Sequence, residues 1–91
     1  MKEIINTLKN NKELNERLQE GVEFDSYYND NQLLIKIRIP FEVCTEDFLG
    51  RGTLNKVHET IINTGNFKLI SSETLESFNK CYSYMVEYAI K

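Results

Sequence analysis

The residues of this chain that could do chemistry are few and widely spaced. His58 is the only histidine, and Cys44 and Cys81 are the only cysteines. A thiolate–imidazole pair needs Cys44 and His58 in hydrogen-bonding distance, with an oxyanion-stabilising group beside them. Nothing in their spacing provides this arrangement. We therefore interpret both as half-buried core residues, and we predict no catalytic residue and no enzyme activity.

Metal binding has less support than the thiol–imidazole pair. The three potential ligands are scattered, with no CxxC and no HxxxH pattern, so we predict no metal site and no cofactor. Two cysteines that belong to no disulfide framework are typical of an intracellular chain with reduced thiols. This favours a cytoplasmic location.

The GRGT stretch is the strongest local signal for ligand binding. Two glycines before a helix N-terminus free backbone N–H groups, and basic or hydroxyl side chains nearby add further donors for a phosphate or carboxylate. The predicted anion-binding residues are Gly50, Arg51, Gly52, Thr53 and Lys56.

The same stretch resembles the glycine loop of KH domains, which clamps a nucleic-acid backbone between two helices. The resemblance implies a nucleic-acid-binding module that uses this loop. The chain departs from that pattern because it lacks GxxG and has no room for a full helix between Pro40 and Gly50. Glu46 and Asp47 also lie alongside, and in the alternative interpretation Arg51 simply pairs with them.

Length and composition indicate one globular domain, residues 1–91. Hydrophobic residues make up 41% of the chain and charged residues 27%, which is near the globular average. A net charge of -3 argues against nucleic acid or an anionic membrane as the main partner. The N-terminus has no apolar signal region, and no segment approaches the roughly 20 apolar residues that span a bilayer.

The first half of the chain predicts helix followed by a hairpin. Residues 2–20 follow a helical period, which the Asn10–Asn11 pair could divide into two helices, and Gly21 stops the helix. Residues 22–28 and 33–39 then alternate as two strands around a turn at Asp30–Asn31. The turn fixes a register in which the predicted cross-strand pairs are Val22–Ile39, Glu23–Arg38, Phe24–Ile37, Asp25–Lys36 and Tyr28–Leu33.

The second half predicts helix, strand and helix. Residues 41–52 are irregular, with a helical turn at 45–48, and a helix follows from Thr53 as N-cap to Thr64, with Gly65 after it. Residues 66–70 form a short third strand. Residues 82–90 alternate like a strand, but the charges of residues 73–91 gather on one side of a helical wheel. We therefore predict a C-terminal amphipathic helix with Cys81 on its buried side.

The resulting fold class is α+β in the order α-β-β-α-β-α, with a small three-stranded sheet packed against helices. Tyr27, Leu34 and Ile70 should lie on the sheet face away from the core, and Tyr84 on the polar side of the last helix. These four residues are the predicted partner-binding site, because exposed aromatic residues are enriched at binding hot spots. In the alternative, a helix covers this face or the tyrosines are isolated surface residues.

Composition and the lack of a catalytic constellation favour a small non-catalytic protein-interaction protein. We expect an inhibitor or accessory factor, of a phage or mobile element, that binds a host protein. The alternative is a nucleic-acid-binding module that uses the loop from Gly50 to Lys56. The chain could be a monomer or a homodimer.

Overall fold

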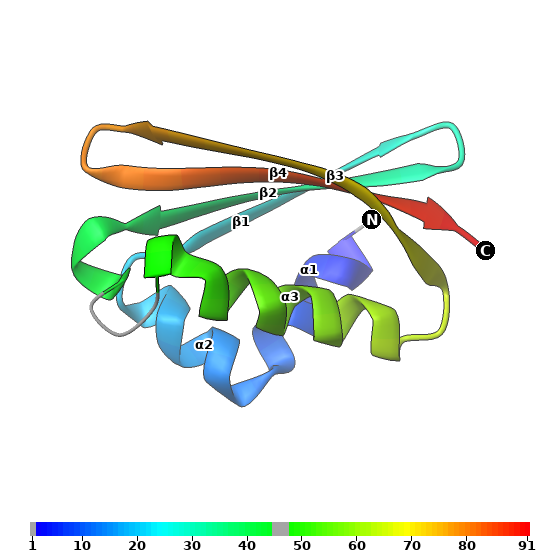
Figure 1. The fold of residues 1–91 in the computed structure, drawn as a ribbon. Coiled ribbons are helices and arrows are strands. Elements are labelled where there is room, and N and C mark those ends of the chain that lie inside the picture. Colours follow the sequence, from blue (N-terminus) through cyan, green and yellow to red (C-terminus); the bar gives the residue numbers. More distant parts are fainter. Residues whose placement is uncertain (1, 45–47) are drawn as a thin grey trace.

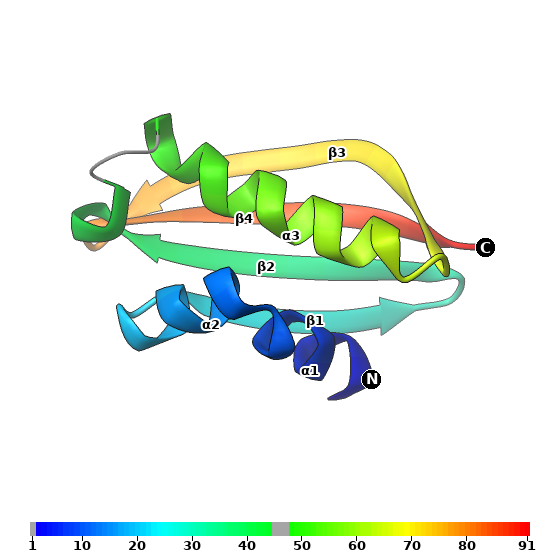
Figure 2. The same cartoon turned by 90° about the horizontal axis from the view of Figure 1, so that it is seen from below.

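The computed structural model describes residues 2–44 and 48–91, without the side chains of residues 2, 3, 44, 48 and 71. Its elements form two layers. The helices all lie against one face of a twisted antiparallel sheet, and in the described part of the chain nothing covers the other face (Figures 1 and 2). In chain order the elements are α1 (Lys2–Asn10), α2 (Lys12–Gln19), β1 (Glu23–Asn29), β2 (Gln32–Pro40), the 3-10 turns η1 (Phe41–Cys44) and η2 (Phe48–Gly50), α3 (Arg51–Asn63), β3 (Phe67–Phe78) and β4 (Cys81–Ile90).

The N-terminal helical region is divided at the asparagine pair. Asn11 caps α2, because its side-chain oxygen accepts hydrogen bonds from the backbone N–H groups of Glu13 and Leu14. Gly21 ends the region with a φ of 105°, which glycine adopts at little cost. None of the helices in the described residues is long and apolar enough to cross a membrane.

The predicted β1–β2 hairpin is confirmed in register. Phe24 pairs with Ile37 and Tyr28 with Leu33 on the core side, and Asp30 in the turn has a φ of 52°. On the other side Glu23 pairs with Arg38, and their charged groups lie 3.8 Å apart.

The predicted C-terminal helix is wrong. Residues 67–90 form a second hairpin, so the sheet has four strands in the order β1-β2-β4-β3 instead of three. The alternation of residues 82–90 decides the outcome, because β4 lies between two strands and buries Tyr84, Val86 and Tyr88 on one face. The charges that gather on a helical wheel are instead divided among the edge strand β3 (Glu73 and Glu76), the turn (Lys80), the central strand β4 (Glu87) and Lys91 after its end.

The third strand also runs further than predicted. It extends to Phe78 and reaches β4 through a two-residue turn at Asn79 and Lys80, whose φ angles of 53° and 59° suit a type I′ hairpin turn. The register shifts between Ile70 and Glu73, which leaves residues 71 and 72 as an extra pair in β3. An insertion of two residues preserves the alternation of faces.

Helix α3 begins earlier than predicted. Gly50, with a φ of 77°, is its N-cap, and Thr53 lies buried in the first turn instead of capping the helix. Its C-terminal end agrees with the prediction, since Thr64 is the C-cap and Gly65 follows with a φ of 81°. Most of the predicted helical turn at 45–48 falls on residues 45–47, which lie outside the described residues.

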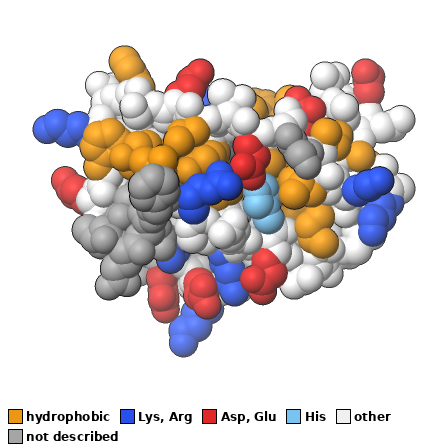
Figure 3. All heavy atoms as spheres, viewed as in Figure 1, with side chains coloured by type: hydrophobic (Ala, Val, Ile, Leu, Met, Phe, Trp, Pro, Cys, Tyr) orange, Lys and Arg blue, Asp and Glu red, His pale blue; other side chains and the backbone are white. Residues whose placement is uncertain are grey.

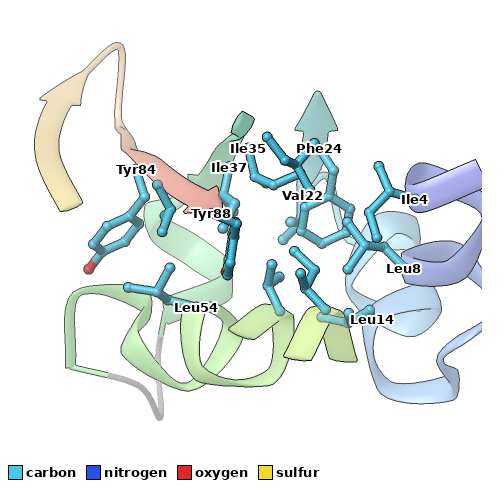
Figure 4. Packing of buried hydrophobic residues seen from close by; sticks show 14 of the residues in the cluster. Ile4, Leu8, Leu14, Val22, Phe24, Ile35, Ile37, Leu54, Tyr84 and Tyr88 are labelled. Atoms are coloured by element: carbon cyan, nitrogen blue, oxygen red, sulfur yellow. The ribbon is translucent and has the colours of Figure 1, made fainter. Parts of the chain in front are cut away.

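One hydrophobic core fills the space between the layers (Figure 4). It combines Leu8 and Leu14 from the N-terminal helices with Leu54 from α3. The sheet contributes its inward side chains, among them Tyr84 and Tyr88, which point from β4 toward α3 (Figure 4). The core therefore covers the helix-facing side of the sheet alone.

The turn between β3 and β4 gives a test of the strand assignment. Lys80 has a positive φ, which costs a non-glycine residue about 1 kcal/mol. We predict that Lys80→Gly raises the free energy of unfolding by about 1 kcal/mol, measured by urea denaturation. In a helix the same change would lower it by about 1 kcal/mol. Lys80→Ala removes the same charge without relieving the backbone and should stabilise the protein less than the glycine variant.

Candidate functional site

The open face of the sheet brings together three of the four predicted partner-binding residues. Tyr27 pairs with Leu34 across β1 and β2, Leu34 pairs with Glu87 of β4, and Glu87 pairs with Ile70 of β3. These four residues form one row across all four strands, which we call the open-face row. At a strand spacing of about 4.8 Å the row is roughly 14 Å long.

The open-face row is accessible and largely apolar. Tyr27 is 50% exposed, and Leu34, Ile70 and Glu87 are half-buried by their neighbours on the sheet. Met85, which is 37% exposed, lies in the next row between Lys36 and Thr74. The row thus presents an apolar strip with one carboxylate inside it.

A shallow hollow of about 310 Å³ lies beside the row. Its lining includes Lys36 from β2, Thr74 and Glu76 from β3 and Met85 from β4. An open hollow with a basic, an acidic, a hydroxyl and a thioether side chain can receive a side chain of another protein. It lacks the enclosed apolar walls that small-molecule sites have.

Charge on the open face is close to balanced. The strand registers place four acidic and three basic side chains there. The acidic residues are Glu23, Asp25, Glu76 and Glu87, and the basic residues are Lys36, Arg38 and Lys68. A face with a slight acidic excess does not attract a phosphate backbone.

Tyr84 does not belong to this face. It is only 1% exposed, and its hydroxyl donates a hydrogen bond of 2.6 Å to the carbonyl oxygen of Leu49. The guanidinium of Arg51 lies 6.0 Å from the centre of its ring. The prediction of an exposed Tyr84 is wrong because a strand turns every second side chain inward, whereas a helix would have placed this one on its polar side.

A chain of polar side chains connects α3 with the second hairpin on the helix side of the sheet. His58 contacts the Tyr88 hydroxyl through Nδ1, and its Nε2 lies 2.7 Å from Oε1 of Glu73. Nη1 of Arg51 donates to Oε2 of Glu73 at 3.0 Å. In Figure 3 the histidine reaches the surface between acidic and basic side chains. We call Tyr88, His58, Glu73 and Arg51 the polar chain.

The proton positions in the polar chain follow from the acceptor at its centre. An ionised Glu73 can only accept, so Nε2 of His58 carries the hydrogen that lies between them. In the neutral imidazole Nδ1 is then an acceptor, and the Tyr88 hydroxyl donates to it. Each hydrogen bond of the polar chain thereby has one donor and one acceptor.

The electrostatics of the polar chain keep Glu73 charged and Tyr88 neutral. Partial burial on its own raises the pKa of Glu73, but the hydrogen bonds from His58 and Arg51, with the charge of Arg51, outweigh it. The net pKa is below the ordinary 4.5. Burial raises the pKa of Tyr88, and the negative charge of Glu73 raises it further. A phenol held neutral in this way is a poor nucleophile or base, so the arrangement serves to tie α3 to the sheet.

Glu73 and Tyr88 were not predicted as site residues, because both lay in the predicted C-terminal helix. The bulge in β3 positions Glu73 opposite Val86, on the face that α3 covers. The alternation of residues 82–90 was the signal that could have turned Tyr88 inward. No local signal identifies Glu73.

The predicted anion-binding residues surround the start of α3, but their cations have partners. Arg51 pairs with Glu73, and Lys56 lies 3.6 Å from carboxylate oxygens of both Glu13 and Glu59. Thr53 Oγ1 is buried and has no hydrogen-bond partner in the described residues. The anion site stays a prediction.

The cysteine and histidine candidates separate in the structure. His58 belongs to the polar chain, while the side chain of Cys44 lies outside the described residues. Cys81 is a free, half-buried thiol at the start of β4, on the open face instead of the buried side of a helix. The described residues contain no group of three or more His, Cys, Asp or Glu placed to hold a metal ion.

Comparison of the chain with protein-family models, with curated protein sequences and with solved structures found no match.

The polar chain predicts how stability depends on pH. Because the pKa of Glu73 is lowered in the folded state, its ionisation stabilises the fold above pH 4.5, and this contribution is lost as pH falls through the lower folded value. We predict that Glu73→Gln lowers the free energy of unfolding by about 1–2 kcal/mol at pH 6. Urea denaturation from pH 6 to pH 3 should show the difference from the unmutated protein shrinking.

Glu16→Gln is the matched control for this experiment. Glu16 is exposed on α2, away from the polar chain, and has no ion pair within the described residues. Its free energy of unfolding should change by less than about 0.5 kcal/mol over the same pH range. A Glu73→Gln effect that is equally large at pH 3 and pH 6 would contradict the assigned role of the carboxylate.

Proposed function

We propose that this chain is a non-catalytic protein that binds another protein through the open face of its sheet, as an inhibitor or accessory factor. The observation that carries the proposal is the open-face row. Tyr27, Leu34 and Ile70 come from three different strands and meet on a face that no element of the described chain covers. An apolar strip with polar surroundings is the usual composition of a protein interface.

The carboxylate in the row specifies the partner's chemistry. Glu87 lies between Leu34 and Ile70, and its charge forms no ion pair within the described residues. A partner that covers the row must pair this carboxylate, because an unpaired charge in a buried interface is costly. We infer a protein with an arginine or lysine surrounded by apolar side chains. Arginine fits this description well, since it is enriched at binding hot spots.

Two features of the face favour protein over nucleic acid. Acidic side chains slightly outnumber basic ones, and Lys36 and Arg38 each have an acidic residue opposite them on β1. Tyr27 is the only exposed aromatic residue among the row and its neighbours, so there is no series of rings on which bases could stack. The origin of the chain in a phage or mobile element stays a prediction from its composition.

We predict that a photo-crosslinking residue in place of Leu34 forms one adduct of defined mass in cells that express the protein naturally. The same residue in place of Asn55, which is exposed on α3, is the control and should not form it. Mass spectrometry of the adduct identifies the partner, which is then purified. Calorimetry with this partner should show binding at least tenfold weaker for Glu87→Lys and for Tyr27→Thr.

Phe78→Thr serves as the matched control in the calorimetry. Phe78 is 75% exposed on the same face but opposite Cys81, at the far end of the hairpin from the row. Its change should leave the affinity within about twofold. An adduct formed equally from positions 34 and 55 would overturn the proposed face. A salt-sensitive mobility shift of DNA or RNA that Arg51→Glu abolishes would favour a nucleic-acid-binding function instead.

A further inference from the structure

The strand β3 forms a long edge of the sheet. In the described sheet only β4 pairs with it, so the backbone groups on its other side are available along Phe67–Phe78. The opposite edge, β1, is much shorter at Glu23–Asn29. A long edge with unpaired N–H and C=O groups is a ready template for another strand.

Apolar side chains accompany this edge on its helix side. Leu69 is 37% exposed and Leu75 42%, although both point toward the side that α3 covers. Ile62, at the end of α3, is 38% exposed. Figure 3 looks onto this side of the molecule and shows hydrophobic side chains on both sides of the histidine. The edge therefore has two apolar areas that flank a polar centre.

On the open face, the charged side chains of β3 have no charged residue opposite them on β4. Lys68 lies opposite Ala89 and Glu76 opposite Ser83, and neither forms an ion pair within the described residues. The edge thus carries one base and one acid at opposite ends, both on the open face.

We propose that the occupant of this edge is β3 of a second copy of the chain, antiparallel and centred on Ser72, so that two sheets form one continuous sheet. This pairing places Lys68 opposite Glu76 of the second copy and Leu69 opposite Leu75 of the second copy. By two-fold symmetry each pair occurs twice. The edge is self-complementary in both charge and apolar character.

Neighbouring registers lose this match. A shift of the centre by half a residue would pair open-face side chains with helix-side ones, which the alternation of a strand forbids. A centre on residue 73 places Glu73 against its own copy, and like charges directly opposite are destabilising. A centre on residue 71 places Leu69 against Glu73 and Lys68 against Thr74. Of these three neighbouring centres, only Ser72 pairs both the charges and the leucines.

The bulge in β3 fits the same centre. Bulges commonly protect edge strands from pairing, because they interrupt the ladder. Here the extra residues, 71 and 72, lie at the proposed two-fold axis. The interruption therefore occurs once, in the middle, and residues 67–70 and 73–78 remain regular on either side of it.

Charge exchange tests the register. Analytical ultracentrifugation of the full chain should show a reversible dimer, and Lys68→Glu or Glu76→Lys alone should weaken it about tenfold or more, because each creates two like-charge pairs. An equimolar mixture of the two single variants should restore dimers, since only the mixed dimer pairs opposite charges. The chain that carries both changes should also dimerise like the unmutated protein.

Glu16→Lys is the control for Glu76→Lys, because it makes the same change from glutamate to lysine at an exposed position of α2. It should leave the dimer constant unchanged, and circular dichroism should show that every variant is folded. A monomer at concentrations of about 100 µM would overturn the proposal. So would a dimer in which the mixture of single variants is no stronger than either variant alone.

Discussion

The pairing of β4 with strands on both of its sides is the constraint on which the rest of the structure depends. Because β4 is central, its alternate side chains must be buried under helices or exposed on the open face. Tyr84 and Tyr88 point inward, and each fixes another element. The Tyr84 hydroxyl holds the Leu49 carbonyl just before α3, and Tyr88 contacts His58 within α3. Glu87 and Met85 of the same strand point outward and lie on the open face.

The polar chain distinguishes the helix side of the sheet, where the charged groups are paired within the molecule, from the open face proposed for binding. Glu73 receives hydrogen bonds from His58 and Arg51, so its acceptors are used within the molecule. These groups hold the start of α3 against the edge strand and offer little to a ligand. Glu87 differs, because its neighbours across the sheet, Leu34 and Ile70, cannot pair its charge. A carboxylate without an ion pair in its own protein is available to pair with a charge of a binding partner, whereas one that is already paired is not.

The parts of the fold that the sequence predicted are those with local signals. The β1–β2 register followed from Asp30 in a two-residue turn and from opposite charges that coincide in one alignment. Asn11 could be recognised as a cap because its neighbours follow a helical period. These signals placed Tyr27 and Leu34 on the correct face.

The second hairpin could not be recognised in the same way. Residues 73–91 satisfy a helical and a strand period at once, and the deciding interaction is non-local. As an edge strand, β2 would have hydrogen-bond partners only on the side of β1, and the backbone N–H and C=O groups on its other side would be unpaired. Pairing with β4 satisfies those groups. The turn at Asn79–Lys80 lacks the glycine that normally marks such a turn, so nothing local opposed the helix.

The proposed dimer and the open-face row are geometrically compatible, because they use different parts of the sheet. Edge pairing occupies the backbone of β3 and the helix-side leucines, while Tyr27 and Leu34 lie on the far strands. Ile70 lies at the end of the row next to the edge, so a second copy would extend the open face beyond it without covering it. Two rows would then lie on one continuous sheet, related by the two-fold axis. A partner that is itself two-fold symmetric could engage both rows together, and its second contact would form at a high effective concentration. The edge would thus determine how many rows a partner meets, and the face would determine which partner binds.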